Sequence, residues 1–324
     1  MVKTGVIGVG VMGKNHARVY SEISEFVGAY DLNSSLVDPI SDKFHSKSFN
    51  SIEDLLSEVD AISVATPTTT HFDICSMALN AGVNVLVEKP ITRSIDEAKQ
   101  LCDLAETNDL TFAVGHIERY NPVIGYVKNK IMSGEYGNII SLSSKRVSSF
   151  PQRINDVGVI FDLGIHELDI LRYLANSEVK SIYAHSGNNN GLDNEDYANI
   201  SLLFENGIFG TIETNWLTPM KVRKLSLTGS KKFVELDYAS QKIFESTGNL
   251  SNYDEGNLSK DPWTYQTIEN QLNYSEPLKN ELQNFLFAIE NNKKPLVSGN
   301  DGLESLKLAE LSVKSAMNEE LIKL

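Results

Sequence analysis

Cysteine is nearly absent from this sequence. The 324-residue chain contains only two, Cys75 and Cys102, and no other metal ligands stand at a suitable spacing around them. Two isolated thiols exclude a disulfide framework, and the missing ligand spacing argues against a structural metal site. We therefore expect two reduced, structural thiols and no bound metal.

Positive charge and long apolar runs are also scarce. The chain has 29 basic against 43 acidic residues and a formal net charge of -14, which disfavours non-specific binding to nucleic acid. No stretch approaches the ~20 apolar residues of a membrane-spanning helix. Glycines interrupt the apolar residues near the N-terminus, unlike the continuous core of a signal peptide. We expect a soluble, cytoplasmic protein that binds neither nucleic acid nor membrane.

Short apolar runs alternate with amphipathic stretches in the first third of the chain. This alternation is typical of βαβ units around a parallel sheet. The run at residues 61–65 is almost wholly apolar, as expected for a strand buried on both faces. The predicted strands lie at residues 6–8, 26–31, 61–65, 84–87 and 111–114.

The periodicity changes after Gly115. Asn121 and Pro122 form a strong helix start, with Asn as the N-cap and Pro at the first helical position. From Ile139 onward most apolar residues alternate with polar ones, as in half-buried strands. The predicted strands lie at residues 139–147, 180–185, 198–204, 209–216, 224–228 and 233–236, and the predicted helices at 161–174, 278–290 and 302–317.

These patterns, with a length that suggests two domains, predict an α/β protein. Residues 1–118 are expected to form a Rossmann domain, with a doubly wound parallel sheet. Residues 119–324 are expected to form an α+β domain with an open, mostly antiparallel sheet, and its C-terminal helices can pack back on the first domain. The polar segment 246–275 is left open between a surface loop and a hairpin.

Glycines 8, 10 and 13 follow the first predicted strand and open a helix. In that context the first glycine permits a tight turn, the second lets the backbone approach a pyrophosphate, and the third allows close helix–strand packing. The N–H groups at the helix start, around Val11 and Met12, can bind phosphate oxygens. The sequence therefore predicts a dinucleotide site.

Two further strand ends lie near this predicted site. Asp31, 18 residues after Gly13, can accept hydrogen bonds from ribose hydroxyls and would repel a 2′-phosphate, which favours NAD over NADP. Thr66 and Pro67 end the next strand and are expected to face the cofactor. His71 is predicted to contact nicotinamide or ribose, although a histidine at a helix start often has no special role.

Glu88 and Lys89, before Pro90, follow the strand at residues 84–87. This position places a cation at the carboxyl edge of the sheet, where ligands of open α/β sheets bind. A partly desolvated lysine can stabilise negative charge on a reacting oxygen. Taken alone, the same three residues are equally typical of an ordinary surface loop.

Asp162 and His166 stand four residues apart at the start of a predicted helix, so we expect them to share one face. Histidine is a natural proton acceptor when a hydride leaves a secondary alcohol, and Asp162 can orient the substrate or raise the basicity of the ring. The alternative is a helix-capping aspartate beside a solvated histidine.

Together these elements resemble the glucose–fructose oxidoreductase, inositol dehydrogenase and rhizopine-catabolism (Gfo/Idh/MocA) family. The resemblance covers the whole chain. It rests on the order and spacing of the glycine turn with Asn15-His16-Ala17, Ala65-Thr66-Pro67 with His71, Glu88-Lys89-Pro90, and Asp162-x-Gly164-x-His166-x-x-Asp169.

The family resemblance implies roles for these residues. It implies that Lys89 lies between cofactor and substrate, that Asp162 and His166 are catalytic with His166 as the general base, and that Glu88 and Lys89 belong to the cofactor site. It also implies that the second domain binds the substrate and assembles homodimers or homotetramers through its sheet face.

Segments 115–122 and 145–158 are similar to those of the nucleotide-sugar dehydrogenases within this family. A sugar diphosphate needs cationic, forked donors, which Arg119, Arg146 and Arg153 supply, with Lys145 as a further cation. Tyr120 can stack on a uracil or sugar face. Each of these charges, taken singly, is equally typical of a solvated loop or strand.

The resemblance implies NAD-dependent oxidation of a sugar hydroxyl, with the 3-hydroxyl of UDP-N-acetylglucosamine as the favoured substrate. The first alternative is a dehydrogenase for a free polyol or sugar such as an inositol, in which Arg146 and Arg153 point away from the substrate. A second alternative is a non-catalytic NAD-binding regulator, which would function without Lys89 and His166.

Overall fold

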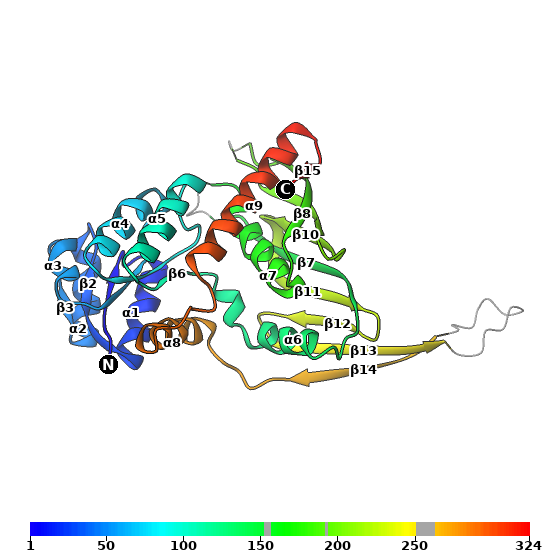
Figure 1. The fold of residues 1–324 in the computed structure, drawn as a ribbon, viewed down its shortest axis with the longest axis horizontal. Helices are drawn as coiled ribbons and strands as arrows, with labels where there is room; N and C mark the ends of the chain where they lie inside the picture. The colour runs from blue at the N-terminus through cyan, green and yellow to red at the C-terminus, as the bar shows by residue number, and fades with distance from the viewer. Residues whose placement is uncertain (152–156, 192–193, 251–262) are drawn as a thin grey trace, which may run out of the picture. The chain divides into compact units, whose positions relative to one another are not determined.

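The computed structural model describes residues 1–151, 157–191, 194–250 and 263–324. The chain divides into two units (Figure 1). The first unit contains Met1–Tyr120 and Ser275–Lys307, and the second contains Asn121–Tyr274 and Leu308–Leu324. The first unit therefore includes a segment that lies between the two parts of the second unit along the chain.

A six-stranded parallel sheet forms the centre of the first unit, with the strand order β3-β2-β1-β4-β5-β6. The order reverses direction between β1 and β4, which is the switch point of a Rossmann fold, so the prediction for this unit is confirmed. Its strands are β1 (Lys3–Ile7), β2 (Glu25–Tyr30), β3 (Lys47–Ser48), β4 (Ala61–Val64), β5 (Asn84–Val87) and β6 (Phe112–Val114).

Helices of the first unit come from both parts of its chain. One core cluster joins Val6 of β1 and Tyr20 of α1 to Leu282 and Phe285 of the C-terminal helix α8. The helix predicted to open at the glycines is α1, and the helix predicted at 278–290 is α8. They are α1 (Val11–Ile23), α2 (Ser34–Phe44), α3 (Ile52–Leu56), η1 (Thr68–Thr70), α4 (His71–Asn80), α5 (Ile95–Thr107), η2 (Ile117–Tyr120) and α8 (Pro277–Glu290).

The second unit is built on a nine-stranded sheet with the order β14-β13-β12-β11-β7-β10-β9-β8-β15. Its described strand pairs are antiparallel except β7 with β10, as predicted for a mostly antiparallel sheet. The strands are β7 (Ile139–Ser149), β8 (Val179–Gly187), β9 (Tyr197–Phe204), β10 (Phe209–Asn215), β11 (Leu217–Gly229), β12 (Phe233–Asp237), β13 (Lys242–Leu250), β14 (Trp263–Gln271) and β15 (Ile322–Lys323).

One face of this sheet is covered by helices α6 (Pro122–Met132) and α7 (Ile165–Ala175), and by the second half of α9 (Gly299–Asn318). Alternate residues of β9 and β10 are buried against these helices, and the residues between them are exposed or half-exposed. The period of two in the sequence therefore arises because one sheet face is open. Asn121 caps α6 as predicted, since its side chain accepts the Val123 N–H.

One segment differs from the sequence-based expectation: the helix predicted at 161–174 begins with a π-helical turn, η3 (Ile160–Gly164), which leads directly into α7. The segment 246–275, left open between a loop and a hairpin, contributes to the antiparallel strands β13 and β14, visible in Figure 1 as a long two-stranded ribbon. Within the described ranges, no helix has the length and hydrophobicity needed to cross a membrane.

Candidate active site

The glycine turn after β1 has the geometry that a dinucleotide requires. Gly8 has a positive φ of 83°, and a Cβ atom at Gly13 would lie 1.8 Å from the Gly8 carbonyl oxygen. Neither position accepts a side chain without distortion. A Cβ at Gly10, in contrast, would meet no atom of the described residues within 4 Å, so among these residues the backbone at Gly10 is open to a ligand.

Helix α1 starts at this turn with Gly10 as its N-cap. No side chain in the described part of the chain caps its first N–H groups, and its first turn contains no acidic residue. The positive end of the helix dipole and these N–H groups therefore fit a pyrophosphate. Val11 is 63% exposed and Met12 is half-buried, so both flank the open end of the helix.

Asp31 follows β2 and is tied to the glycine turn. Its Oδ2 atom accepts the Val9 N–H at 2.8 Å, and its Oδ1 atom accepts the Asn33 N–H at 2.9 Å. The Gly8 N–H donates to the Tyr30 carbonyl at 2.8 Å, which links the same two loops. This places a carboxylate beside the turn, where the ribose hydroxyls of a dinucleotide bind.

Thr66 and His71 lie after β4. The Thr70 hydroxyl donates to Thr66 Oγ1 at 2.8 Å, and Pro67 is exposed. His71 is only 1% exposed, and its ring nitrogens lie 2.9 Å from the Pro90 carbonyl and 3.0 Å from the Thr66 carbonyl. Burial lowers the pKa of His71, and a neutral ring donates to one of the two carbonyls at a time. The ring thus joins two loops, which does not support the expected contact with nicotinamide.

Lys89 follows β5 and is half-buried. The preceding residue, Glu88, points into the first unit: its Oε1 atom lies 3.1 Å from His16 Nε2, and its Oε2 atom accepts the Lys89 N–H at 3.3 Å. Burial acts to raise the pKa of Glu88, but His16 and Lys89 together hold it below its usual value. Glu88 therefore supports the main chain at Lys89, and its expected contact with a cofactor stays a prediction.

A cluster of buried polar side chains, His16, Ser63 and Tyr20, adjoins Glu88, and the sequence analysis assigned these residues no role. His16 Nδ1 lies 2.9 Å from Ser63 Oγ, and the Tyr20 hydroxyl lies 2.8 Å from the same oxygen. Glu281 of α8 is 1% exposed. The signal that the sequence offered for this cluster was the presence of polar residues on helix faces that are otherwise apolar.

In the second unit, Asp162 lies in the π-helical turn and His166 in the first turn of α7, and both are half-buried. The turn is held by the loop before β9, since the Ile160 N–H donates to Glu195 Oε1 at 3.1 Å. Burial raises the pKa of Glu195. Single π-helical turns within helices are frequent at functional sites, which agrees with a role for this segment.

Arg146 occupies the core of the second unit. It is 2% exposed, and its Nε atom donates to Glu167 Oε1 at 2.5 Å. The Tyr238 hydroxyl donates to the other Glu167 oxygen at 3.1 Å, and the guanidinium carbon lies 5.5 Å from the Tyr238 ring centre. This buried charge is already matched, so the geometry does not support the expectation that Arg146 binds a diphosphate.

Arg119 and Tyr120 are similarly engaged within the first unit. Arg119 is 5% exposed and donates to Asp301 at 3.0 Å and to the Leu296 carbonyl at 3.2 Å. Burial opposes ionisation of Asp301, but the charge of Arg119 and bonds from Ser298 lower its pKa to about 2. The Tyr120 hydroxyl donates to the Asn284 side chain. Arg153 lies outside the described residues.

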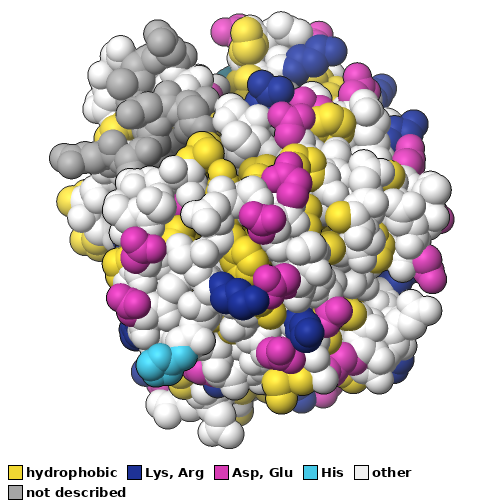
Figure 2. Space-filling model, turned by 90° about the vertical axis from the view of Figure 1, so that its left-hand side faces the viewer, with side chains coloured by type: hydrophobic (Ala, Val, Ile, Leu, Met, Phe, Trp, Pro, Cys, Tyr) yellow, Lys and Arg dark blue, Asp and Glu magenta, His cyan; other side chains and the backbone are white. Residues whose placement is uncertain are grey.

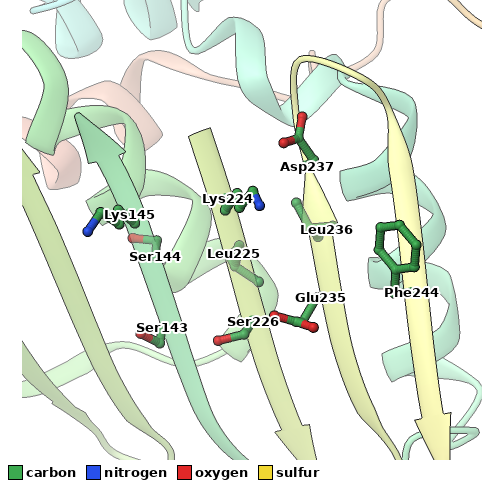
Figure 3. Close-up of a pocket in the computed structure, with 10 residues that line it drawn as sticks. All are labelled: Ser143, Ser144, Lys145, Lys224, Leu225, Ser226, Glu235, Leu236, Asp237 and Phe244. Carbon is green, nitrogen blue, oxygen red and sulfur yellow. The ribbon is translucent and has the colours of Figure 1, made fainter. Parts of the chain in front are cut away.

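The open face of the second sheet carries a hollow of about 240 Å³ (Figure 3). Lys145 and Lys224, on neighbouring strands, lie beside it with Glu235 and Asp237. Lys145 pairs with Glu213 at 2.8 Å, and it projects from the face of β7 opposite to Arg146 and α7. The hollow therefore lies on the opposite side of the sheet from His166.

On the face seen in Figure 2, acidic and basic side chains are interspersed.

Comparison with known proteins identifies the family. Residues 2–116 match an oxidoreductase family model with an NAD-binding Rossmann fold, and residues 128–324 match the C-terminal alpha/beta domain of that family. The chain belongs to the Gfo/Idh/MocA family of oxidoreductases. The resemblance noted in the sequence is thereby confirmed.

Individual relatives have related activities. UDP-N-acetylglucosamine 3-dehydrogenase from Acidithiobacillus ferrooxidans is 32% identical over 242 residues, covering 75% of this chain and 76% of the relative. Its solved structure matches with a TM-score of 0.87, 28% identity and 98% coverage of both chains. Glucose-6-phosphate 3-dehydrogenase from Bacillus subtilis is 27% identical, with 99% of this chain and 98% of the relative covered.

A third relative, scyllo-inositol 2-dehydrogenase (NAD(+)) from Bacillus subtilis, is 25% identical over 98% of this chain and 94% of the relative. As a member of this family, the Gfo/Idh/MocA protein described here is an NAD(P)-dependent dehydrogenase that acts on CH–OH groups of sugars or polyols.

Proposed function

We propose that this protein oxidises a secondary hydroxyl of a sugar to a ketone, with Lys89 and His166 as its catalytic residues. One observation carries the proposal. The glycine turn, Asp31, Thr66 and Lys89 follow β1, β2, β4 and β5, so all four lie at the carboxyl edge of one parallel sheet. That edge is where open α/β sheets bind their ligands.

His166 accepts the hydroxyl proton, and Asp162 orients the substrate or the imidazole ring. The Lys89 ammonium hydrogen-bonds to the reacting oxygen and stabilises the negative charge that develops there. The carbon–hydrogen bond breaks as the C–O double bond forms, and the nicotinamide of the bound cofactor supplies the hydride acceptor. The products are a ketone, the reduced cofactor and a proton.

NAD is the proposed cofactor. Asp31 is held beside the glycine turn by its bond from Val9, so its charge is fixed where the adenosine ribose binds. A carboxylate there accepts bonds from ribose hydroxyls and repels a 2′-phosphate. The contacts proposed for the cofactor are the backbone at Gly8–Gly13 and the side chains of Asp31 and Thr66.

The first substrate to test is UDP-N-acetylglucosamine, at its 3-hydroxyl. Support comes from the A. ferrooxidans relative, which is similar over most of this chain in sequence and over nearly all of it in fold. A second relative is named as a 3-dehydrogenase of a phosphorylated sugar. In this proposal, Arg119, Tyr120 and Arg146 stabilise the protein and do not contact the diphosphate.

A free polyol or sugar is the second candidate substrate. It is favoured by one observation, the burial of Arg146 and Arg119 against Glu167 and Asp301. Two of the cations expected for a diphosphate are thus already paired. An inositol dehydrogenase among the relatives is compatible with this reading.

We also propose that the protein forms homodimers or homotetramers through the open face of the second sheet. Leu203, Phe209 and Phe233 are 38%, 46% and 39% exposed on that face. Leu203 and Phe209 are cross-strand partners, so their side chains lie together. Light scattering should give a dimer or larger species for the natural protein and a smaller one for Phe209→Glu.

The test of the substrate is formation of NADH by the purified protein with UDP-N-acetylglucosamine, N-acetylglucosamine, myo-inositol and glucose, each with NAD and with NADP. Turnover with the nucleotide sugar alone supports the first candidate. Turnover with a free polyol or sugar rejects it and supports the second. Absence of turnover in protein shown to carry no bound NADH contradicts both.

A further inference from the structure

Helix α1 carries a histidine whose position links two parts of the proposed site. His16 is completely buried and stands on the second turn of the helix that begins at the glycine turn. Its Nε2 atom lies 3.1 Å from Glu88 Oε1, and its Nδ1 atom lies 2.9 Å from Ser63 Oγ on β4. One ring thus contacts the loop after β5 and the strand next to β1.

Glu88 extends this link to the lysine. While one of its oxygens meets His16, the other accepts the main-chain N–H of Lys89 at 3.3 Å. Gly115 leaves room for this carboxyl group, because a Cβ at Gly115 would lie only 3.0 Å from Glu88 Oε2. The path from helix α1 to Lys89 therefore consists of two hydrogen bonds and one carboxylate.

The donors along this path form a consistent chain. The Tyr20 hydroxyl can donate to Ser63, the Ser63 hydroxyl to His16 Nδ1, and the His16 Nε2–H to Glu88, so the chain is complete even with a neutral imidazole. Buried polar networks in which each group has its partner hold one geometry. Such a network is suited to fixing the position of the residue at its end.

A second buried carboxyl group, Glu281, has a raised pKa and does not compete with Glu88 for the negative charge. Glu281 lies 1% exposed, and neither of its oxygens has a hydrogen-bond partner within the described residues. Burial, with the nearby charges of Glu88 and Glu118, raises the pKa of Glu281 well above its usual value. The pKa of Glu88 is lowered, so Glu88 is ionised and able to accept both bonds.

We propose that His16 is a positioning residue that acts through Glu88: it fixes Lys89 relative to the helix that binds the dinucleotide. This inference rests on the proposed role of Lys89 at the reacting hydroxyl. The dinucleotide binds at the first turn of α1, and His16 lies one turn further along the same rigid helix. The placement of the lysine is thus set by the element that holds the cofactor.

A matched pair of variants tests whether the bond from His16 to Glu88, and not the bond to Ser63, positions Lys89. In His16→Gln the side-chain amide reaches the position of Nε2 and keeps the bond to Glu88, whereas in His16→Asn it reaches only the position of Nδ1 and keeps the bond to Ser63. We expect kcat to fall roughly 10- to 100-fold in His16→Asn, because small misplacements of catalytic groups have effects of this size. His16→Gln should recover most of that loss.

The two variants should bind NADH with dissociation constants within about threefold of the natural protein, because the glycine turn is intact. Glu88→Gln keeps the size of the side chain, removes its charge and should reproduce the His16→Asn effect. Melting temperatures are measured for all three, and Glu88→Gln provides the test if His16→Asn does not fold. Equal kcat values for the Gln and Asn variants would overturn the proposal.

A double-mutant cycle with Lys89→Met separates this inference from the proposed function. If His16 acts through Lys89, His16→Asn should lower turnover no further in the Lys89→Met background. Independent, multiplicative losses would overturn the positioning role while leaving Lys89 catalytic. If Lys89→Met alone leaves turnover unchanged, it is the proposed function that fails.

One further readout needs neither cofactor nor substrate. The rate at which acetic anhydride modifies Lys89 in the free protein, followed by peptide mass spectrometry, reports the surroundings of the amine. It should change in His16→Asn and stay near the natural value in His16→Gln. Identical rates in both variants would count against the link.

Discussion

Arg146 Nε lies 2.5 Å from Glu167 Oε1 in the core of the second unit, and both side chains are at most 2% exposed. Glu167 is the residue after His166, and it stands on the first turn of α7. The pair therefore joins strand β7 to the helix that carries the proposed general base. We infer that Arg146 stabilises the helix that carries His166, whereas the sequence analysis expected Arg146 to bind the substrate.

Replacing Arg146 should therefore affect stability first. Arg146→Met leaves Glu167 buried without its cation, and breaking a buried pair in this way costs about 3–5 kcal/mol of unfolding free energy. Urea unfolding measures the loss. Lys145→Met is the matched control, because Lys145 neighbours Arg146 but forms an exposed pair with Glu213, worth about 1 kcal/mol or less. An unchanged unfolding midpoint in Arg146→Met, with a raised KM for UDP-N-acetylglucosamine, would restore the diphosphate role.

The glycine turn offers a test that separates folding from cofactor binding. A methyl group at Gly13 collides with the Gly8 carbonyl, whereas one at Gly10 contacts none of the residues that the structure describes. Gly13→Ala should lose roughly 1–3 kcal/mol or more of stability, as overpacked positions do. Gly10→Ala should keep the melting temperature of the natural protein and bind NADH more weakly by calorimetry. Unchanged NADH affinity in Gly10→Ala would place the pyrophosphate elsewhere.

Asp31 has two separable roles, a hydrogen bond to Val9 and a negative charge. Asp31→Asn can still accept the Val9 N–H but carries no charge, so it should bind NAD nearly as well and NADP better. Asp31→Ala loses both and should weaken binding of NAD as well. The ratio of kcat/KM for NAD and NADP measures the effect. A ratio unaffected by Asp31→Asn would remove Asp31 from cofactor selection.

Because Glu281 has a raised pKa in the folded protein, the free energy of unfolding should depend on pH. Its folded-state pKa is raised above the usual 4.5, so above pH 4.5 the unfolded chain releases a proton that the folded protein retains. Stability is therefore lost as the pH rises from 4.5 toward the folded-state pKa, by up to ~1.4 kcal/mol per pH unit. Glu281→Gln should be more stable than the natural protein at neutral pH and lose this advantage near pH 4.5. If the free energies of unfolding of Glu281→Gln and the natural protein differed by the same amount at every pH in that range, Glu281 would be ionised in the folded protein.

The features that the sequence predicted best are those controlled by local pattern. The βα alternation, the glycine turn and the Asn121 cap each depend on residues close together in the chain. The strand ends that carry Asp31, Thr66 and Lys89 were placed correctly for the same reason, because buried parallel strands are short apolar runs.

The environments of His16, Glu281 and His71 could not be predicted in this way. Each is buried by elements distant in sequence: Glu88 meets His16 across 72 residues, and α8 returns from the C-terminal region. Arg146 is a different case, because the alternation along β7 places it with Leu142 and Ser144 on the buried face. That period of two was available in the sequence.

Single-turnover formation of NADH shows whether Lys89 and His166 carry the oxidation. Lys89→Met and His166→Asn are compared with the natural protein, each saturated with NAD and with the substrate identified above. We expect rates at least about 100-fold lower in both variants, as for the loss of a general base or an oxyanion donor, with NADH affinity retained. Rates near the natural value in either variant would contradict this expectation.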